Sequence, residues 1–382
     1  MQIADLLNDL IRERGPLTVA AFMDVALYDP DLGYYARTAQ RSGRAGDFFT
    51  SVDIGPLFGE LLETQIGEMA GILEARSQKP EAQSPFDLVE SGAGNGRLSA
   101  DILRAASRRD PRFYERIRLH LTEASASARE AQRTTLAGER DVSDRLLSSS
   151  QSLPSSFEGV LIANELLDAL PVHQVVMRAG GLREVYVDAC DDRLITREGP
   201  LSTPALAGYL NRLGVVLEPG WRVEINLRAI EWIRAAARSL ARGFMIVIDY
   251  GHEARELYSV THAGGTLTTF ARHTMAGPER PADGPAWLED AGDRDITAHV
   301  DFTSVRVAAE AAGLTTIGFL DQTYFLMGLG AATLDVSDLK KRLALKTLLM
   351  PGGLGSTLKV LILGKNAGAP ALRGCSFKVR VT

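Results

Sequence analysis

The chain has 382 residues, 45% of them hydrophobic and 24% charged, which is enough for two domains or for one domain with a large insertion. Its net charge of −6 argues against a nucleic-acid-binding protein, and no apolar run approaches the ~20 residues that insert across a bilayer. The two cysteines, Cys190 and Cys375, stand far apart in no metal-ligand spacing, which favours a reducing compartment.

The N-terminal residues are predicted to be helical. An apolar stripe with helical spacing runs through residues 3–13, and a longer one runs through residues 57–73. We therefore expect residues 1–80 to form a helical region that packs on the core of the protein. Acidic residues interrupt the first helix, which fits neither a signal peptide nor an acid-poor transit peptide, so we expect a cytoplasmic protein.

The next stretch predicts a strand, a glycine-rich turn and a helix. Residues 86–89 form a short apolar run, and residues 99–108 repeat apolar side chains at helical spacing. Glycines in such a turn let the backbone bend tightly and let a ligand approach closely, and the helix beyond offers unpaired N–H groups. The candidate cofactor-binding residues of this turn are Glu90, Gly92, Gly94, Asn95 and Gly96.

Two ligand classes use a turn of this kind. A dinucleotide requires G-x-G-x-x-G, but Arg97 stands where that pattern needs its third glycine, which disfavours an oxidoreductase. S-adenosylmethionine carries no phosphate and binds at E-x-G-x-G-x-G, the register that Glu90 and the three glycines have here. The alternative is a tight turn with a purely structural role.

Acidic and amide side chains follow two further predicted strands. Glu123 follows the strand at residues 118–122, where a carboxylate can accept from both hydroxyls of a ribose, although it could also be a helix-end acid. Asn164, Glu165 and Asp168 follow the apolar strand at residues 157–163. Because open α/β sheets bind ligands at the carboxyl ends of their strands, these residues are candidates for the site.

The strand and helix alternation stops after Gln174. Residues 175–187 predict a hairpin with a Gly-Gly turn, and we read the rest, to about residue 222, as an irregular insertion that covers the site. A helix at 226–240 and a buried strand at 244–248 resume the pattern. Strands are expected at 314–319 and 358–363 with a helix over 324–349 between them, followed by a loosely held tail from Ala367.

Metal and hydrolase chemistry are not expected. The six histidines show no i, i+4 pair, and His120 and Glu123 would point to opposite faces of a strand, so we predict no metal site. No G-x-S-x-G elbow is present for a serine hydrolase.

Taken together, several stretches resemble the MidA-like family of S-adenosylmethionine-dependent methyltransferases. The most specific are residues 164–174 and 295–301, and matching stretches cover most of the chain up to about residue 365. The resemblance implies an α/β fold: a Rossmann-like class I methyltransferase sheet, with its last strand antiparallel, an N-terminal helical region and a cap insertion between the fourth and fifth strands. The expected parts are residues 1–80 (helical region), 81–174 and 223–365 (the Rossmann-like domain), 175–222 (cap insertion) and 366–382 (C-terminal tail).

The resemblance also implies a function. The mitochondrial member of the family is a protein-arginine methyltransferase that serves respiratory complex I assembly, so a protein substrate, such as a respiratory-chain subunit, is expected. Carboxylates would then orient the guanidinium, and Glu165 and Asp168 are our candidates, with Asn164 touching either cofactor or substrate. By resemblance, Asp47 and Phe48 lie in a loop that closes over the cofactor.

The chain departs from the family pattern at two places. Val52-Asp53 replaces the usual Pro-Glu, and Ser356 replaces an acid near the C-terminus, which leaves any substrate-binding role of that acid in doubt. The loss of this acid keeps a second hypothesis open, in which the protein is a cofactor-binding assembly factor or scaffold without turnover. The sequence makes no prediction of the oligomeric state.

Overall fold

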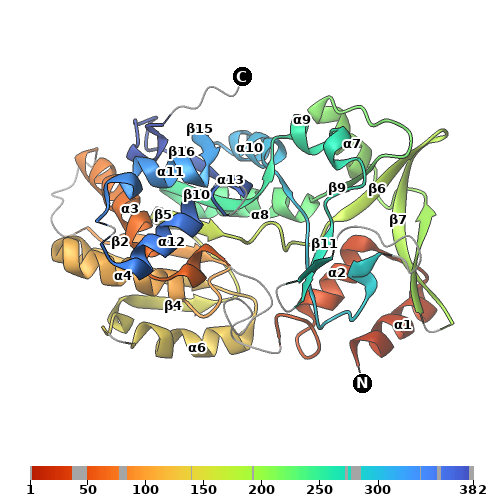
Figure 1. The fold of residues 1–382 in the computed structure, drawn as a ribbon, viewed down its shortest axis with the longest axis horizontal. Coiled ribbons are helices and arrows are strands. Elements are labelled where there is room, and N and C mark those ends of the chain that lie inside the picture. Colours follow the sequence, from red (N-terminus) through yellow and green to blue (C-terminus); the bar gives the residue numbers. More distant parts are fainter. Residues whose placement is uncertain are drawn as a thin grey trace.

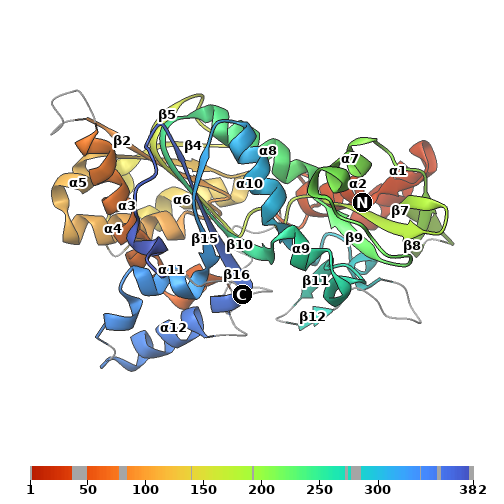
Figure 2. The ribbon, with the colours of Figure 1, turned by 90° about the horizontal axis from the view of Figure 1, so that it is seen from above.

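The computed structural model describes residues 2–36, 50–76, 84–138, 140–191, 193–271, 274–276, 285–335, 337–350 and 354–377. Two parts lie side by side (Figure 1), and the view from above separates them in the same way (Figure 2). One part is built on a large sheet that includes β2, β5 and β10, and the other contains the N-terminal helices together with β6, β7 and β9.

The large sheet has the strand order β15-β16-β10-β5-β2-β3-β4. The pairs within β10-β5-β2-β3-β4 are parallel, whereas β16 runs antiparallel to both of its neighbours. This topology confirms the expected class I methyltransferase sheet and its antiparallel last strand. The strands are β2 (Phe86–Ser91), β3 (Ile117–Thr122), β4 (Leu146–Ser150), β5 (Phe157–Asn164), β10 (Leu240–His252), β15 (Thr315–Asp321) and β16 (Leu358–Lys365), with β14 (Val300–Asp301) paired to the end of β10.

Apolar residues occupy both faces of the central strands, because helices cover both faces. In β10, Phe244, Ile246 and Ile248 pack with one set of helices, whereas the alternate residues Met245 and Val247 pack with the other. The first set is α3 (Leu57–Ala75), α4 (Arg97–Arg109), α11 (Gln322–Gly328) and α12 (Leu339–Leu349); the second is α7 (Ala205–Leu213), α8 (Leu227–Ser239) and α10 (Phe302–Ala311).

The insertion between β5 and β10 forms a second sheet, where a cap insertion was expected. Its sequence contains more regular structure than predicted, because β8 and α7 follow the predicted hairpin. Apart from β1, the strands lie within the insertion, and β9 leads into α8. The strands are β1 (Leu17–Thr18), β6 (His173–Arg178), β7 (Gly181–Cys190), β8 (Arg193–Gly199) and β9 (Arg222–Ile225).

The N-terminal residues divide between the two parts. Helices α1 (Ile3–Arg14) and α2 (Val19–Tyr28) share an apolar cluster with Val176, Val185 and Val187 of the second sheet, and β1 pairs with β7. Helix α3, by contrast, packs on the large sheet. The proposed division of the chain into domains stays a prediction, and these contacts place α1 and α2 with the insertion.

Two C-terminal expectations are wrong. The helix predicted over residues 324–349 is split into α11 and α12, since Gly330 adopts a φ of +93° between them. The predicted loose tail is packed as far as Cys375: Leu372 is buried, and the N–H of Gly374 donates to Gln65 Oε1 at 3.0 Å. The other helices and strands are α5 (Pro111–Arg116), α6 (Ala126–Leu136), α9 (Ala254–Leu257), α13 (Leu354–Thr357), β11 (Thr268–Ala271), β12 (Thr274–Ala276) and β13 (Asp295–Thr297).

Candidate active site

A cavity of about 650 Å³ opens at the carboxyl ends of β2, β3 and β5. Parallel α/β sheets bind ligands at this edge, where strand ends and helix N-termini meet. Predicted residues from three different strand ends line it: Gly92 after β2, Glu123 after β3 and Glu165 after β5. Other lining residues are Tyr28, Tyr35, Ser91, Thr122, Gln151, Leu153, Leu166, Ala169, Leu170 and Trp232.

The glycine-rich turn has a backbone that side chains rarely adopt. Gly92, Gly94 and Gly96 have φ values of +73°, +50° and +81°. A Cβ added at Gly92 would lie 3.0 Å from Leu166 Cδ1, whereas a Cβ at Gly94 would enter open space. The turn therefore needs glycine for its conformation, and at Gly92 also for room.

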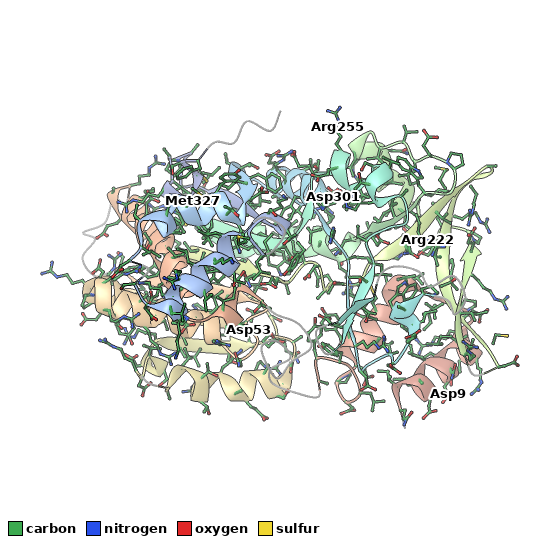
Figure 3. The ribbon with its side chains drawn as sticks, in the orientation of Figure 1. Asp9, Asp53, Arg222, Arg255, Asp301 and Met327 are labelled. Carbon is green, nitrogen blue, oxygen red and sulfur yellow. The ribbon has the colours of Figure 1, made fainter. Side chains whose placement is uncertain are left out.

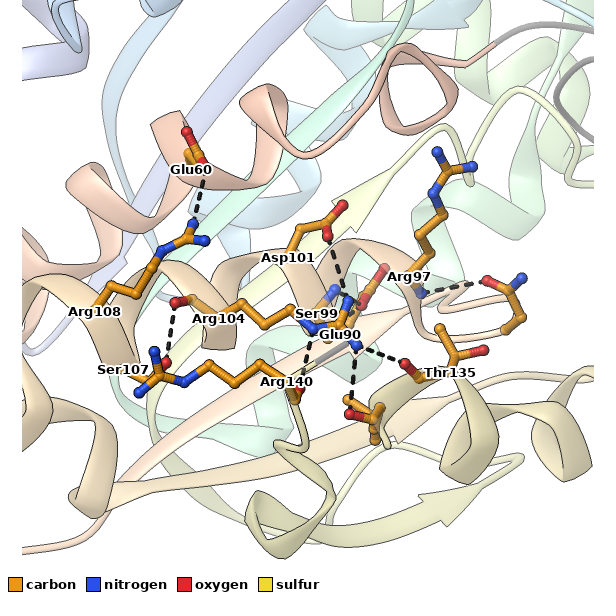
Figure 4. A network of polar contacts seen from close by, with 12 residues as sticks. Glu60, Glu90, Arg97, Ser99, Asp101, Arg104, Ser107, Arg108, Thr135 and Arg140 are labelled. Atoms are coloured by element: carbon orange, nitrogen blue, oxygen red, sulfur yellow. Dashed lines mark hydrogen bonds and ion pairs between the residues drawn. The ribbon is translucent and has the colours of Figure 1, made fainter. Parts of the chain in front are cut away.

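Glu90 is not among the residues that line the cavity; its side chain holds the start of the helix that follows the turn. Its buried carboxylate accepts hydrogen bonds from the backbone N–H of Ser99, at 3.2 Å, and from the Ser99 hydroxyl (Figure 4). Burial raises the pKa of Glu90 to about 7. Arg97, the first residue of α4, forms an ion pair with Asp53 at 3.1 Å. Asp53 is labelled in Figure 3. Asp53, one of the departures from the family pattern, thus braces the turn.

Glu123 connects the turn to the next helix. One carboxylate oxygen accepts from the N–H of Gly94 and the other from the N–H of Ser125, both at 2.8 Å. Ser125 in turn caps α6 by accepting from the N–H of Ala128. The contact with Ser125 agrees with the interpretation of Glu123 as a helix-end acid, and its role toward a ribose stays a prediction. An ionised carboxylate accepts about four hydrogen bonds, so two acceptor positions remain for a ligand in the cavity.

Asn95 lies in the same turn, where its Oδ1 accepts from the N–H of Arg97 at 3.3 Å. This short-range contact shapes the start of α4. Asp47 and Phe48, the two predicted residues of the closing loop, lie outside the described residues.

Glu165 has the most unusual backbone at the site. Its φ is +52°, a left-handed conformation that costs a non-glycine residue energy and is concentrated at functional sites. Its Oε1 accepts from the N–H of Ser51 at 3.1 Å and from Asn164 Nδ2 at 3.2 Å. Burial, with a contribution from Asp168, raises the pKa of Glu165 to about 8. Among the described residues, Asn164 Oδ1 is buried without a hydrogen-bond partner.

Asp168 is buried next to two acids that sequence reasoning did not single out as site residues. Burial, Asp249 and Asp295 raise its pKa well above the usual range. Asp249 orders the Asp168 loop, because its Oδ2 accepts from the N–H of Leu166 at 3.0 Å and of Leu167 at 2.7 Å. Its place at the carboxyl end of β10 was the available signal. Glu165, Asp168, Asp249 and Asp295 therefore form one acidic cluster, and Glu165 is the member of this cluster that lines the cavity.

Two tyrosines that line the cavity adjoin this acidic cluster. Tyr28 and Tyr35 line the cavity and stack with their ring centroids 5.4 Å apart. Tyr35 donates to Asp295 Oδ1 at 2.8 Å, and Tyr28 donates to the carbonyl of Ala169 at 3.0 Å. These contacts connect the two rings to the segments that carry Asp168 and Asp295.

The cavity fits the cofactor that the turn suggests. It combines a glycine-lined backbone, a carboxylate with spare acceptor positions at the end of β3, and the apolar side chains Leu153 and Trp232. Thr122 is another lining residue, and its Oγ1 is buried without a hydrogen-bond partner among the described residues. The spare acceptor positions of Glu123 suit a ligand that carries hydroxyl donors.

The histidines are arranged in a way that their spacing did not reveal. His252, His262 and His299 come from three segments and meet in the fold. Burial and its two histidine neighbours lower the pKa of His299 to about 4. His120 and His173 have separate partners, Ser148 Oγ and Glu184 Oε1, at 2.8 and 2.7 Å.

Comparisons with known proteins bear on the family and the cofactor. Residues 70–320 match the family model described as S-adenosyl-L-methionine-dependent methyltransferase. The mitochondrial protein arginine methyltransferase NDUFAF7 of Mus musculus is 31% identical over 357 residues, covering 86% of this chain and 75% of the relative. Its homologue in Drosophila melanogaster is 30% identical over 370 residues, covering 87% and 76%.

A crystal structure from Burkholderia thailandensis, bound to S-adenosyl-homocysteine, has a similar fold. The TM-score is 0.86 at 28% identity, and the match covers 99% of this chain and 95% of that chain. A second crystal structure from the same organism gives a TM-score of 0.84 at 27% identity, with the same coverage.

The expected cytoplasmic localisation is contradicted by the curated relatives, which are mitochondrial proteins. The acidic residues of the first helix therefore do not decide the compartment: α1 has a packing role, with Ile3, Leu7 and Ile11 buried against its neighbours. In the described part of the chain, no helix combines the length and apolar character needed to cross a bilayer.

Proposed function

The chain belongs to this family of S-adenosyl-L-methionine-dependent methyltransferases, the MidA-like family that its sequence resembles, and on that premise we propose that it methylates arginine side chains of a protein substrate. The observation that carries the proposal is the cluster of acids beside the cofactor cavity. Glu165 lines the cavity, and Asp168 is buried three residues further along the chain. The relatives named protein arginine methyltransferases support the same acceptor.

The residues that would hold the cofactor follow from the cavity. The turn at Gly92 and Gly94 would receive the amino-acid part, and Glu123 would accept from the ribose hydroxyls. Glu90 would act indirectly, by holding Ser99 and the start of α4. Asn95 and Gly96 would shape the turn, and we keep Asp47 and Phe48 as proposed parts of a closing loop.

The acids would act on the substrate rather than on the cofactor. A guanidinium is permanently cationic and planar, so a carboxylate can fix its orientation with paired N–H donors. With its pKa at about 8, Glu165 is largely protonated in the free protein at neutral pH. An arriving guanidinium would lower this pKa, so that the carboxyl group would release its proton to water and the resulting carboxylate would pair with the substrate.

The methyl group is supplied by the sulfonium of the cofactor, whose carbon–sulfur bond breaks as a carbon–nitrogen bond forms. The guanidinium nitrogen must present its electron pair in line with that bond, and it loses one proton in the process. We propose that Glu165 orients this nitrogen and takes up the proton, while Asn164 and Ser51 hold the carboxylate in place.

The proposal is tested by transfer of tritiated methyl groups into proteins of an extract from cells that lack this protein. After acid hydrolysis, the label should co-migrate with methylated arginine. Label in another amino acid would overturn the arginine assignment. If this protein binds S-adenosylhomocysteine but transfers no label to the proteins of the extract, the scaffold hypothesis is favoured. The link to respiratory complex assembly stays a prediction.

A further inference from the structure

Three histidines from separate segments meet beyond the carboxyl end of β10. His252 ends that strand, His262 lies in the short helix Val260–His262, and His299 directly precedes β14. One ring nitrogen of each lies within 4.8 Å of those of the other two. The ring centroids are 4.9, 5.2 and 6.0 Å apart. None of the three lines the 650 Å³ cavity, so this cluster is separate from the proposed cofactor site.

A single residue contacts two of the rings on their outer side. Glu256 Oε1 lies 3.0 Å from His252 Nδ1, and the Glu256 carbonyl oxygen lies 3.1 Å from His262 Nδ1. Metal-binding histidines commonly donate one ring N–H to a carboxylate or a carbonyl, which fixes the tautomer and leaves the other nitrogen for the metal. Only the His262 contact is a hydrogen bond, because His252 Nδ1, although close to Glu256 Oε1, has no hydrogen-bond partner among the described residues. With Nδ1 of His262 held in this way, its Nε2 is available to a metal ion.

Like His252, the third histidine has a buried ring nitrogen without a hydrogen-bond partner among the described residues. This nitrogen is His299 Nδ1. The backbone of His299 is nevertheless held, because its N–H donates to Thr266 Oγ1 at 3.1 Å. An unpaired polar nitrogen in a buried position costs stability, so this atom is suited to bind a ligand.

We propose that His252, His262 and His299 form a site for one divalent transition-metal ion, with Zn²⁺ as the expected occupant. Three neutral imidazoles suit zinc, nickel and copper and do not suit calcium or magnesium. Nitrogen ligands at the usual zinc distance are about 3.4 Å apart, so the rings need to approach by about 1 Å or slightly more. Small side-chain rotations provide such a movement.

The site would connect elements that lie next to the cofactor cavity and the insertion. His299 precedes β14, whose Asp301 (labelled in Figure 3) caps α10. Asp301 also accepts a hydrogen bond from Tyr209 Oη of the insertion at 2.8 Å. Lys359 is the other charged side chain that acts on His252, and it is already paired with Asp321 at 2.5 Å. A bound ion would therefore brace the end of β10 against β14 and the segment after α9.

The test uses the full chain, dialysed against a chelator and then titrated with Zn²⁺ by calorimetry. We expect one equivalent to bind with micromolar or tighter affinity, and Co²⁺ to give the visible absorption of a tetrahedral nitrogen site. His299→Gln or His262→Gln should abolish stoichiometric binding. Glu256→Gln should weaken it by about tenfold, because it removes an outer-shell carboxylate. His120→Gln is the matched control and should bind like the wild type.

Zinc binding should also raise the melting temperature of the wild type and leave that of His299→Gln unchanged. Titration with S-adenosylhomocysteine verifies that each variant is folded, since the cavity does not include these histidines. His262→Gln gives a second ligand variant if His299→Gln does not fold. The proposal is wrong if the wild type binds no stoichiometric zinc, or if both variants bind zinc as the wild type does.

Discussion

Replacement of Glu123 by glutamine tests which of two roles this residue has: binding the ribose of the cofactor, or only holding the start of α6. The wild-type carboxylate takes two backbone N–H bonds, from Gly94 and Ser125, and keeps two acceptor positions for the ribose hydroxyls. Glutamine keeps the shape of the side chain but loses the charge and one acceptor oxygen. Hydrogen bonds to a charged group contribute about 1.5–3 kcal/mol each, so weakening two of them should reduce the affinity for S-adenosylhomocysteine by about 100-fold.

The assay is calorimetric titration with S-adenosylhomocysteine and with its 2′-deoxy analogue. The wild type should strongly prefer the ligand with both hydroxyls, and Glu123→Gln should lose most of that preference. Glu130 is an exposed acid on α6, the helix that follows Glu123, so Glu130→Gln is the control and should bind like the wild type. The ribose assignment is refuted if Glu123→Gln keeps wild-type affinity, or loses the same affinity for both ligands.

Three further variants test the glycine-rich turn (Gly92→Ala), the C-terminal packing (Leu372→Ala) and the acidic cluster (Glu165→Gln). Gly92→Ala, where an added Cβ would lie 3.0 Å from a leucine side chain at φ +73°, should lower the free energy of unfolding by about 1–2 kcal/mol and weaken cofactor binding; Gly71→Ala, in open space on α3, should do neither. Leu372→Ala should cost about 2–4 kcal/mol in urea unfolding, whereas Phe377→Ala, at an exposed residue, should cost little. Burial raises the pKa of Glu165 to about 8 from a usual value of 4.5, so the protonated form stabilises the fold; stability is complete below pH 4.5 and is lost as the pH rises through 8. The melting temperature of the ligand-free wild type should therefore fall between pH 6 and 9. The melting temperature of Glu165→Gln should fall less over the same pH range. The pKa shift is contradicted if the melting temperatures of both proteins depend equally on pH.

Much of the fold could be predicted from local pattern. The buried strands, the glycine turn and the hairpin after Gln174 follow from apolar periodicity and turn residues, which act over short distances in the chain. The break between α11 and α12 was missed, because the apolar periodicity continues across Gly330. The tail was missed because its packing depends on Gln65, far away in sequence.

The sequence predicted those site residues that directly follow a strand of the sheet. Glu123 and Glu165 follow strands directly, and parallel strands bring their carboxyl ends together. Glu90 has the predicted position in the turn, but its carboxylate points to Ser99 instead of into the cavity. The sequence could not show that His262 would meet His252 and His299, because the long connection between β10 and β14 determines that contact.

The central claim is that Glu165 acts on the methyl acceptor and not on the cofactor. Its most direct test measures S-adenosylhomocysteine affinity and methyl transfer side by side for the wild type and Glu165→Gln. The two proteins should bind the ligand within about tenfold of each other, since charged cofactor contacts are retained, while methyl transfer should be abolished in the variant. Comparable turnover in Glu165→Gln would contradict the account and remove Glu165 from the mechanism.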